Sequence, residues 1–140
     1  EQVEQVLKMV KMDEFVQRKP YGLNSILEEG ATNLSSGERQ RFSIAKALIT
    51  NPDVLILDES TSNLDANTEE FIVNSLASEK DKIKIVIAHR LNTLAKCDKI
   101  IAINDGNIIE SGTPKELLKK KGMFYQLWSI QNKVLNLKKE

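Results

Sequence analysis

The chain has 140 residues, of which 41% are hydrophobic and 29% charged, a balance typical of one compact domain. Lys plus Arg and Asp plus Glu both total 20, so no basic excess points to nucleic acid as a partner. No apolar run approaches the roughly 18 to 20 residues that a bilayer crossing needs. The one cysteine, Cys97, cannot form an internal disulfide. We therefore expect a reducing, cytosolic setting, with any link to a membrane supplied by another domain.

Two helices are predicted in the first third of the chain. Apolar residues at near-helical spacing predict one helix from about Val3 that ends before the turn residues 19–22. A second helix is predicted to start at the capping box formed by Ser35 and Glu38 and to end at Asn51-Pro52.

A strand, a helix and a second strand are predicted next. Residues 54–57 and 83–88 are continuous apolar runs, as in strands buried on both faces of a parallel sheet. Residues 66–78 between them predict a helix whose inward face carries Phe71, Ile72, Leu76 and Ala77. Strand, helix and strand together form the crossover unit of an α/β fold.

The last third predicts a hairpin followed by helices. Residues 99–104 and 107–110 flank Asp105-Gly106, a strong two-residue turn signal. Residues 113–116 combine an N-cap, a proline and a capping glutamate, so a helix begins there, and a last helix follows Gly122. We expect an α/β fold with a mainly parallel sheet, a C-terminal β-hairpin and C-terminal helices.

Three places carry residues suited to phosphate chemistry. Asp58 and Glu59 stand at the end of an apolar strand, at the edge where open α/β sheets bind ligands. Asp58 could hold a hydrated Mg²⁺ and Glu59 could orient or deprotonate an attacking water. Alternatively, the two residues form only a solvated acidic turn. Residues 34–38 open a helix, so they could cradle a phosphate or simply cap the helix. His89 ends a strand and has either a catalytic or a structural role.

The order and spacing of these motifs closely resemble those of the ATP-binding cassette (ABC) ATPases. In the terms of that family, residues 34–38 resemble the signature motif and residues 54–59 the Walker B strand. Residues 62–65 resemble the D-loop and His89 the switch histidine. The resemblance implies a truncated P-loop NTPase fold, with residues 1–50 as the end of the helical subdomain and residues 51–140 as the part that follows.

The resemblance also implies roles for individual residues. Glu59 would activate the attacking water, His89 would contact the γ-phosphate, and Asp58 would hold Mg²⁺ through water. The residues expected to contact ATP are Ser35, Ser36, Gly37, Glu38, Asp58 and Asp65. Cassettes of this family work as head-to-tail pairs, so Ser35 to Gly37 would reach the ATP of a second nucleotide-binding domain.

Three later segments resemble the exporter branch of the family: residues 88–91, 106–112 and 122–127. Residues 28–30 resemble the exporter loop that touches the intracellular helices of the membrane domain, although a plain acidic turn fits them nearly as well. The implied partners are a second nucleotide-binding domain and a transmembrane domain, at the cytoplasmic face of a membrane. The transported substrate is not implied by any of these residues.

The chain departs from the family pattern at two positions and lacks one motif. Serine stands at position 36 and glutamate at position 38, where the usual signature has glycine and glutamine. The phosphate-binding loop G-x-x-x-x-G-K-[ST] does not occur, and neither do the adenine-stacking aromatic and the glutamine loop that the family carries upstream. We therefore expect Glu1 to be a cut and the chain alone to be inactive.

Two other hypotheses stay open from the sequence alone. The first is a cassette ATPase that moves or clamps DNA, although heptads and a basic surface are missing from the sequence. The second is an interaction module that associates through apolar surface and exposed sheet edges. This last hypothesis concerns the chain itself, which we expect to self-associate.

Overall fold

The computed structural model describes residues 1–28, 33–58, 60–79, 81–87 and 90–137. The chain forms two compact units, Glu1–Ala88 and His89–Glu140. The first unit contains α1 (Gln2–Met9), α2 (Asp13–Gln17), the 3₁₀ turn η1 (Gly22–Asn24), α3 (Ser36–Ile49), β1 (Val54–Asp58), α4 (Ala66–Ser78) and β2 (Ile83–Ile87). The second contains α5 (Leu91–Leu94), β3 (Ile100–Asn104), β4 (Asn107–Gly112), α6 (Pro114–Lys120) and α7 (Met123–Leu137). No helix within these described ranges is long and apolar enough to cross a membrane.

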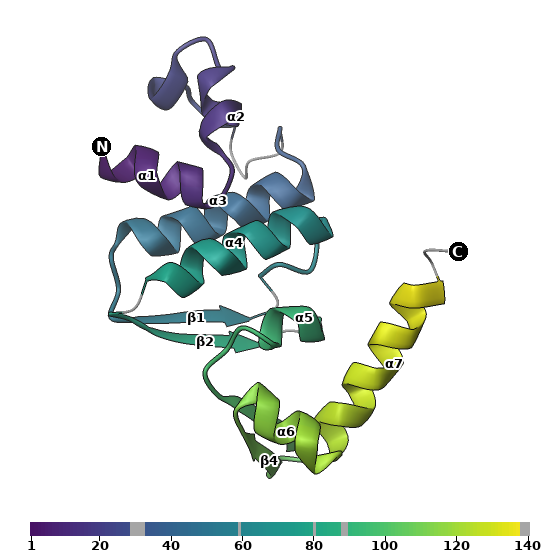
Figure 1. Cartoon of the computed structure of the whole chain (residues 1–140). Helices are drawn as coiled ribbons and strands as arrows, with labels where there is room; N and C mark the ends of the chain where they lie inside the picture. The colour runs from purple at the N-terminus through teal and green to yellow at the C-terminus, as the bar shows by residue number, and fades with distance from the viewer. Residues whose placement is uncertain (29–32, 59, 80, 88–89, 138–140) are drawn as a thin grey trace. The chain divides into compact units, whose positions relative to one another are not determined.

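The first unit is a parallel strand pair covered on one side by helices. β1 pairs with β2 from Val54 opposite Ile83 to Asp58 opposite Ile87. α4 connects the two strands, and α3 and α4 lie over the same side of the pair (Figure 1). Leu55 and Leu57 of β1 join residues of both helices in one buried cluster. The predicted α/β class and its strand, helix, strand unit are confirmed.

Only one face of this strand pair is covered. Leu55 and Leu57 are 4% and 5% exposed, whereas Val54 and Ile56 between them are 47% and 62% exposed. On β2, Ile83, Ile85 and Ile87 are also exposed. The prediction of burial on both faces is therefore wrong for the described residues, because α3 and α4 form a single layer and successive strand side chains alternate between faces.

The predicted first helix is broken into α1 and α2. α1 ends at Met9, and Lys11 adopts the left-handed conformation with φ of 53°. Val10 and Met12 on either side of it are fully buried. Residues two apart cannot share one face of a continuous helix, so the break lets both side chains enter the core. Arg41 of α3 holds this corner by donating from Nη1 to the carbonyl of Lys11 at 3.2 Å.

α4 buries a narrower stripe than its sequence suggested. Ile72 and Leu76 are buried as predicted, but Phe71 and Ala77 are exposed. Each exposed residue is the chain neighbour of a buried one, about 100° further round the helix, and the buried stripe is too narrow to include it. The ring of Phe71 instead lies 4.6 Å from the Lys11 ammonium.

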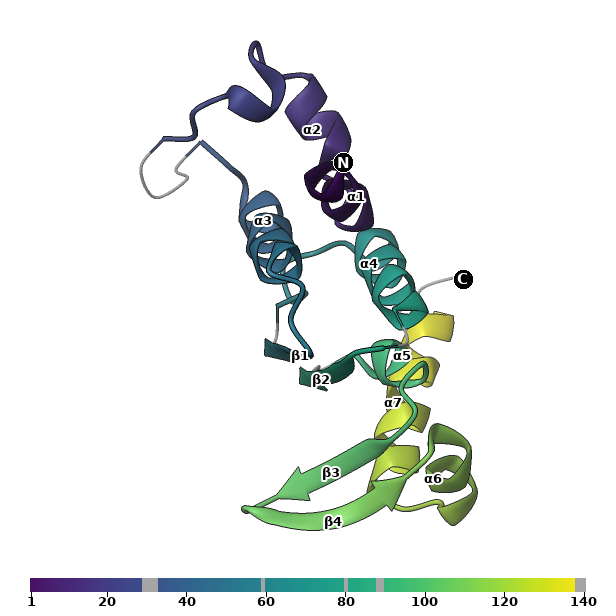
Figure 2. The same ribbon diagram turned by 90° about the vertical axis from the view of Figure 1, so that its left-hand side faces the viewer.

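The second unit is built on the predicted hairpin. β3 and β4 pair antiparallel, and Asp105 and Gly106 have positive φ angles of 48° and 75°, as a two-residue turn of this type requires. The small core of this unit combines Leu91, Ile100, Leu117 and Phe124. In Figure 2, α6 lies beside β4 and leads into α7.

Glu110 ties the hairpin to the last helix. Its carboxylate accepts a hydrogen bond from the backbone N–H of Phe124 at 2.7 Å, in the first turn of α7. Gly122 makes this approach possible, since a Cβ at that position would lie 2.4 Å from the Glu110 Oε2. Gly122 therefore has a packing role, whereas the preceding helix α6 ends at its C-cap residue Lys121, which is in the left-handed conformation with φ of 54°.

The C-terminal end of α4 is capped by a lysine from β2. Lys84 Nζ donates to the carbonyl of Leu76 at 2.7 Å and also to that of Glu79. The side chain is partly buried, and the last carbonyls of a helix otherwise have no intrahelical donor. A cation at this end also interacts favourably with the helix dipole. Lys84 thus couples α4 to the strand that follows it.

Replacing Lys84 by methionine tests this cap. Lys84→Met keeps most of the apolar stem but loses both hydrogen bonds, so we expect the free energy of unfolding to fall by about 1.5 kcal/mol. Urea denaturation followed by circular dichroism measures it. Lys46→Met, on an exposed position of α3, is the matched control and should change little. Equal stability of the two variants would contradict the cap.

Candidate functional site

The start of α3 is organised by a reciprocal capping box. The backbone N–H and the hydroxyl of Ser35 donate to Glu38 Oε2 at 2.8 and 2.7 Å. The N–H of Glu38 donates to Ser35 Oγ at 3.2 Å. The hydrogen bond from the Ser35 side chain, followed by that from its backbone, lowers the pKa of Glu38. The carboxylate is thus turned back onto the helix start, as the S-x-x-E pattern predicts.

The loop of residues 60–65 connects β1 to α4 and is anchored on α4. Leu64 is buried in the core of the first unit. The hydroxyl of Thr61 donates to Glu69 Oε1 at 3.1 Å in a buried hydrogen bond. Asp65 caps α4 by accepting from the N–H of Thr68 at 3.0 Å, and this contact lowers the pKa of Asp65. Asp65 therefore acts as an N-cap, whatever further contact it makes.

The same loop is also bound to α3. Gln40 Nε2 donates to Ser62 Oγ at 3.1 Å, and the N–H of Asn63 donates to Gln40 Oε1 at 3.1 Å. The backbone of Gly37 runs close by, since an added Cβ would lie 3.4 Å from the Asn63 carbonyl oxygen. The first turns of α3 and loop 60–65 are therefore in direct contact.

The parallel topology gathers the described candidate residues on one side of the first unit. Figure 1 shows that α3 and α4 begin on the side where β1 ends. Asp58 is the last residue of β1 and is exposed. The set on this side comprises Ser35, Ser36, Gly37 and Glu38 at α3, Asp58 at β1, and Asp65 at α4. Glu59 and His89, the predicted catalytic pair, lie outside the described residues, as do Glu29 and Gly30 of the predicted exporter loop.

Comparison with known proteins adds independent observations. The family model described as ABC transporter matches residues 1–62. The multidrug resistance-like ATP-binding protein MdlB of Buchnera aphidicola is 44% identical over 132 residues, and a putative multidrug export ATP-binding/permease protein of Staphylococcus aureus is 41% identical over 133 residues. The solved structure of a bacterial Atm1-family ABC exporter with ATP bound matches with a TM-score of 0.83 at 35% identity over 93% of this chain. Over nearly all of its length, the chain is therefore similar in sequence and structure to part of an ABC exporter.

The match to these ABC exporters covers nearly all of the chain but a minor part of each relative. It includes 94% of this chain and 23% of both the Buchnera and the Staphylococcus protein. It also includes 23% of the Atm1-family exporter chain. The exporter branch predicted from the sequence agrees with all three relatives. The division at residue 50 stays a prediction.

Sequence reasoning missed the contacts that join the ABC motifs to each other. Gln40 of α3 bonds loop 60–65, and Arg41 bonds the corner at Lys11. The spacing held one signal for the first of these: Gly37 and Gln40 are three residues apart, so they share one face of the helix. A small residue and an amide on one face are compatible with close approach of another backbone.

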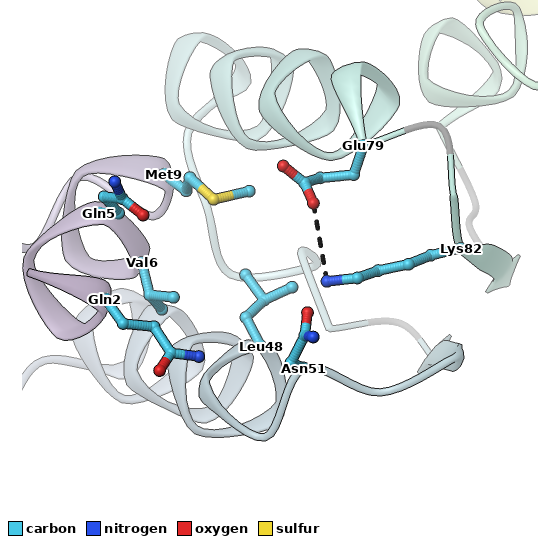
Figure 3. A pocket seen from close by; sticks show the side chains of 8 residues that line it. All are labelled: Gln2, Gln5, Val6, Met9, Leu48, Asn51, Glu79 and Lys82. Atoms are coloured by element: carbon cyan, nitrogen blue, oxygen red, sulfur yellow. Dashed lines mark ion pairs between the residues drawn. The ribbon is translucent and has the colours of Figure 1, made fainter.

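A shallow hollow elsewhere on the first unit is separate from these motifs. It has a volume of about 220 Å³ and lies among α1 and the C-terminal ends of α3 and α4 (Figure 3). Glu79 and Lys82 form an ion pair of 3.6 Å at its rim. None of the predicted site residues that the structure describes lines this hollow. Within the described ranges, no group of three or more His, Cys, Asp or Glu side chains could hold a metal ion.

The capping box at the start of α3 gives the stability of the chain a pH dependence. The pKa of Glu38 is lowered by folding, so its ionised cap stabilises the fold above about pH 4.3 and is lost as the pH falls through the folded pKa. We expect Glu38→Gln to lower the melting temperature at pH 7, because it removes the ionised cap. The decrease should be only about 2 °C, because the carboxylate is largely solvated. The difference in melting temperature between the wild type and Glu38→Gln should disappear towards pH 3. Glu14→Gln, exposed on α2, is the control, and a pH-independent gap would contradict the assignment.

Proposed function

We propose that this chain is the C-terminal portion of the ATP-hydrolysing domain of an ABC exporter, and that the intact protein couples ATP hydrolysis to export across a membrane. The observation that carries the proposal is the gathering of the capped start of α3, Asp58 and loop 60–65 on one side of a unit of this family. The Buchnera relative is named as a multidrug resistance-like ATP-binding protein and the Staphylococcus relative as a multidrug export ATP-binding/permease protein, and both names support the same class of activity.

The proposed chemistry is attack of water on the γ-phosphate of ATP. Glu59, directly after β1, accepts the proton of that water, and His89, two residues after β2, contacts the γ-phosphate. Asp58 supplies one exposed carboxylate at the strand end, which fits a Mg²⁺ ion that keeps most of its water ligands. When bound with ATP, Mg²⁺ would neutralise charge that develops on the phosphate oxygens.

The proposed working assembly is a head-to-tail pair of nucleotide-binding domains. Ser35, Ser36 and Gly37 then face the ATP of the partner domain, with the free N–H groups of the α3 start directed at phosphate. Glu38 stands beside them, and its carboxylate is held by Ser35. Asp65, the last residue of the D-loop motif, caps the start of α4 and is proposed to contact ATP.

The remaining parts of the proposal concern the setting of the domain. A transmembrane domain is the second partner, and the ATP-binding part works at the cytoplasmic face, where ATP is found. The transported substrate is selected by membrane segments, so this chain does not specify it. Because the chain has no phosphate-binding loop, we propose that it does not turn over ATP by itself.

Exposed apolar surface supports a further proposal, that the isolated chain self-associates with a second copy. Val54 and Ile56 of β1 and Ile83, Ile85 and Ile87 of β2 are all exposed, and alternation places them on one face. A two-stranded sheet is marginally stable by itself, so both its outer face and its unpaired edges favour association. A neighbouring copy offers surfaces of the same kind.

Substitution of Glu59 tests the enzymatic proposal in the protein expressed at its full natural length. We expect Glu59→Gln to retain ATP binding and to lower turnover at least about a hundredfold, because an amide cannot accept the proton of the attacking water. His89→Ala should also slow hydrolysis severely. Phosphate release and nucleotide binding are the measurements, and Glu14→Gln on α2 is the control. Near-normal turnover in the Glu59 variant would assign the base to another residue.

Sedimentation velocity of the 140-residue chain at micromolar concentration tests self-association. We expect the chain to sediment as oligomers and the double variant Ile56→Lys, Ile85→Lys to shift towards monomer, because two buried ammonium groups oppose apolar contact. Ile26→Lys is the matched control, since Ile26 is 94% exposed and lies outside the sheet. A monomeric, cooperatively unfolding wild-type chain would contradict the proposal.

A further inference from the structure

We propose that Gln40 is a positioning residue that fixes loop 60–65 to α3, so that the signature helix and the D-loop of one chain move as a single body. The inference rests on the function proposed above, in which α3 faces the partner's ATP and β1 serves the chain's own ATP. Gln40 would thereby link the two sites. It touches neither nucleotide and acts through the loop.

The geometry of the Gln40 amide supports this role. Its Nε2 donates to Ser62 Oγ and its Oε1 accepts from the N–H of Asn63, both at 3.1 Å. One side chain thus uses its donor and acceptor ends on two successive residues of the loop, 22 and 23 positions away in sequence. Two hydrogen bonds from a planar amide restrict both the distance and the rotation of the segment they bind.

The rest of the loop is already held from the other side. Thr61 bonds Glu69 of α4, Leu64 is buried, and Asp65 caps α4. Residues 62 and 63 are the exposed middle of the loop, and Gln40 supplies their side-chain contacts to α3. Without the amide, the loop would remain attached to α4, and its middle would lose this link to α3. The contacts on α4 and those on α3 therefore have separable effects.

This arrangement has a functional consequence. In the proposed enzyme, Asp58 and Glu59 lie directly before the loop, and Ser35 to Gly37 lie three to five residues before Gln40. A shift of α3 when the partner's ATP binds is passed through the amide to the segment next to the water-activating carboxylate. A chain of packed groups with defined hydrogen bonds is the kind of connection that carries such coupling.

The test uses the protein at its full natural length and two independent readouts. Gln40→Met keeps the length of the side chain and removes its hydrogen bonds. Ser62→Ala removes the hydrogen bond from Gln40 Nε2 at an exposed position, and it replaces Gln40→Met as the test variant if Gln40→Met folds poorly. Gln40→Glu keeps two acceptor oxygens, one for the Asn63 N–H and one for the Ser62 hydroxyl proton. Gln126→Met, exposed on α7, is the matched control.

The first readout is deuterium exchange in peptides that cover residues 60–65. We expect Gln40→Met to raise the exchange rate there about fivefold, while Gln40→Glu and Gln126→Met stay near wild type. The second is the kinetics of ATP hydrolysis. We expect kcat to fall about tenfold in Gln40→Met with KM for ATP changed less than about threefold, because positioning and not binding is lost.

A double-variant cycle completes the test. Adding Ser62→Ala to Gln40→Met should cause no further loss of kcat, since both changes remove the same contact. Unchanged exchange in Gln40→Met, or additive losses in the cycle, would overturn the role of Gln40. If the wild type hydrolyses no ATP, the proposed function fails, and the exchange measurement still decides whether the amide fixes the loop.

Discussion

The parallel pairing of β1 with β2 determines where the other parts of the first unit lie. The register that places Asp58 opposite Ile87 brings both strand ends to one edge. A helix that connects two parallel strands must run back against them, so α4 begins at this edge, and α3 leads into β1 in the same way. Residues 35–38 and Asp65 reach the side of Asp58 for this reason, although up to 30 positions separate them in sequence.

The same pairing explains the uneven surface of the unit. α3 and α4 bury Leu55 and Leu57, and the alternation of side chains leaves Val54 and Ile56 on the other face. Each branched side chain forgoes roughly 1.5 to 3 kcal/mol of burial energy when it stays fully exposed. A strand with valine, isoleucine and leucine on both faces is typical of a sheet that is covered by helices on both sides, which makes three layers. The described elements of the first unit supply two of those layers, the strand pair and the layer of α3 and α4.

Local features of the fold could be predicted from the sequence, and features set by tertiary packing could not. The capping boxes at Ser35 and Thr113 and the turn at Asp105-Gly106 depend on neighbouring residues alone, and all three are present. The break at Lys11 depends on the core accepting both Val10 and Met12, which periodicity does not express. The contact of Gln40 with Ser62 requires α3 to lie beside a loop that follows the next strand, so sequence spacing alone did not place it.

The charge at the start of α3 affects how this chain would serve the ATP of a partner. The N-terminal end of a helix attracts anions through its free N–H groups and its dipole. In this chain that end already holds an anion, because Glu38 accepts both the N–H and the hydroxyl proton of Ser35. A phosphate competing for the same hydroxyl would meet a carboxylate, whereas the glutamine usual in the family would present a neutral amide. In the proposed assembly, the N–H groups of Ser36 and Gly37 are therefore the better donors for phosphate, and the Ser35 hydroxyl serves the fold first.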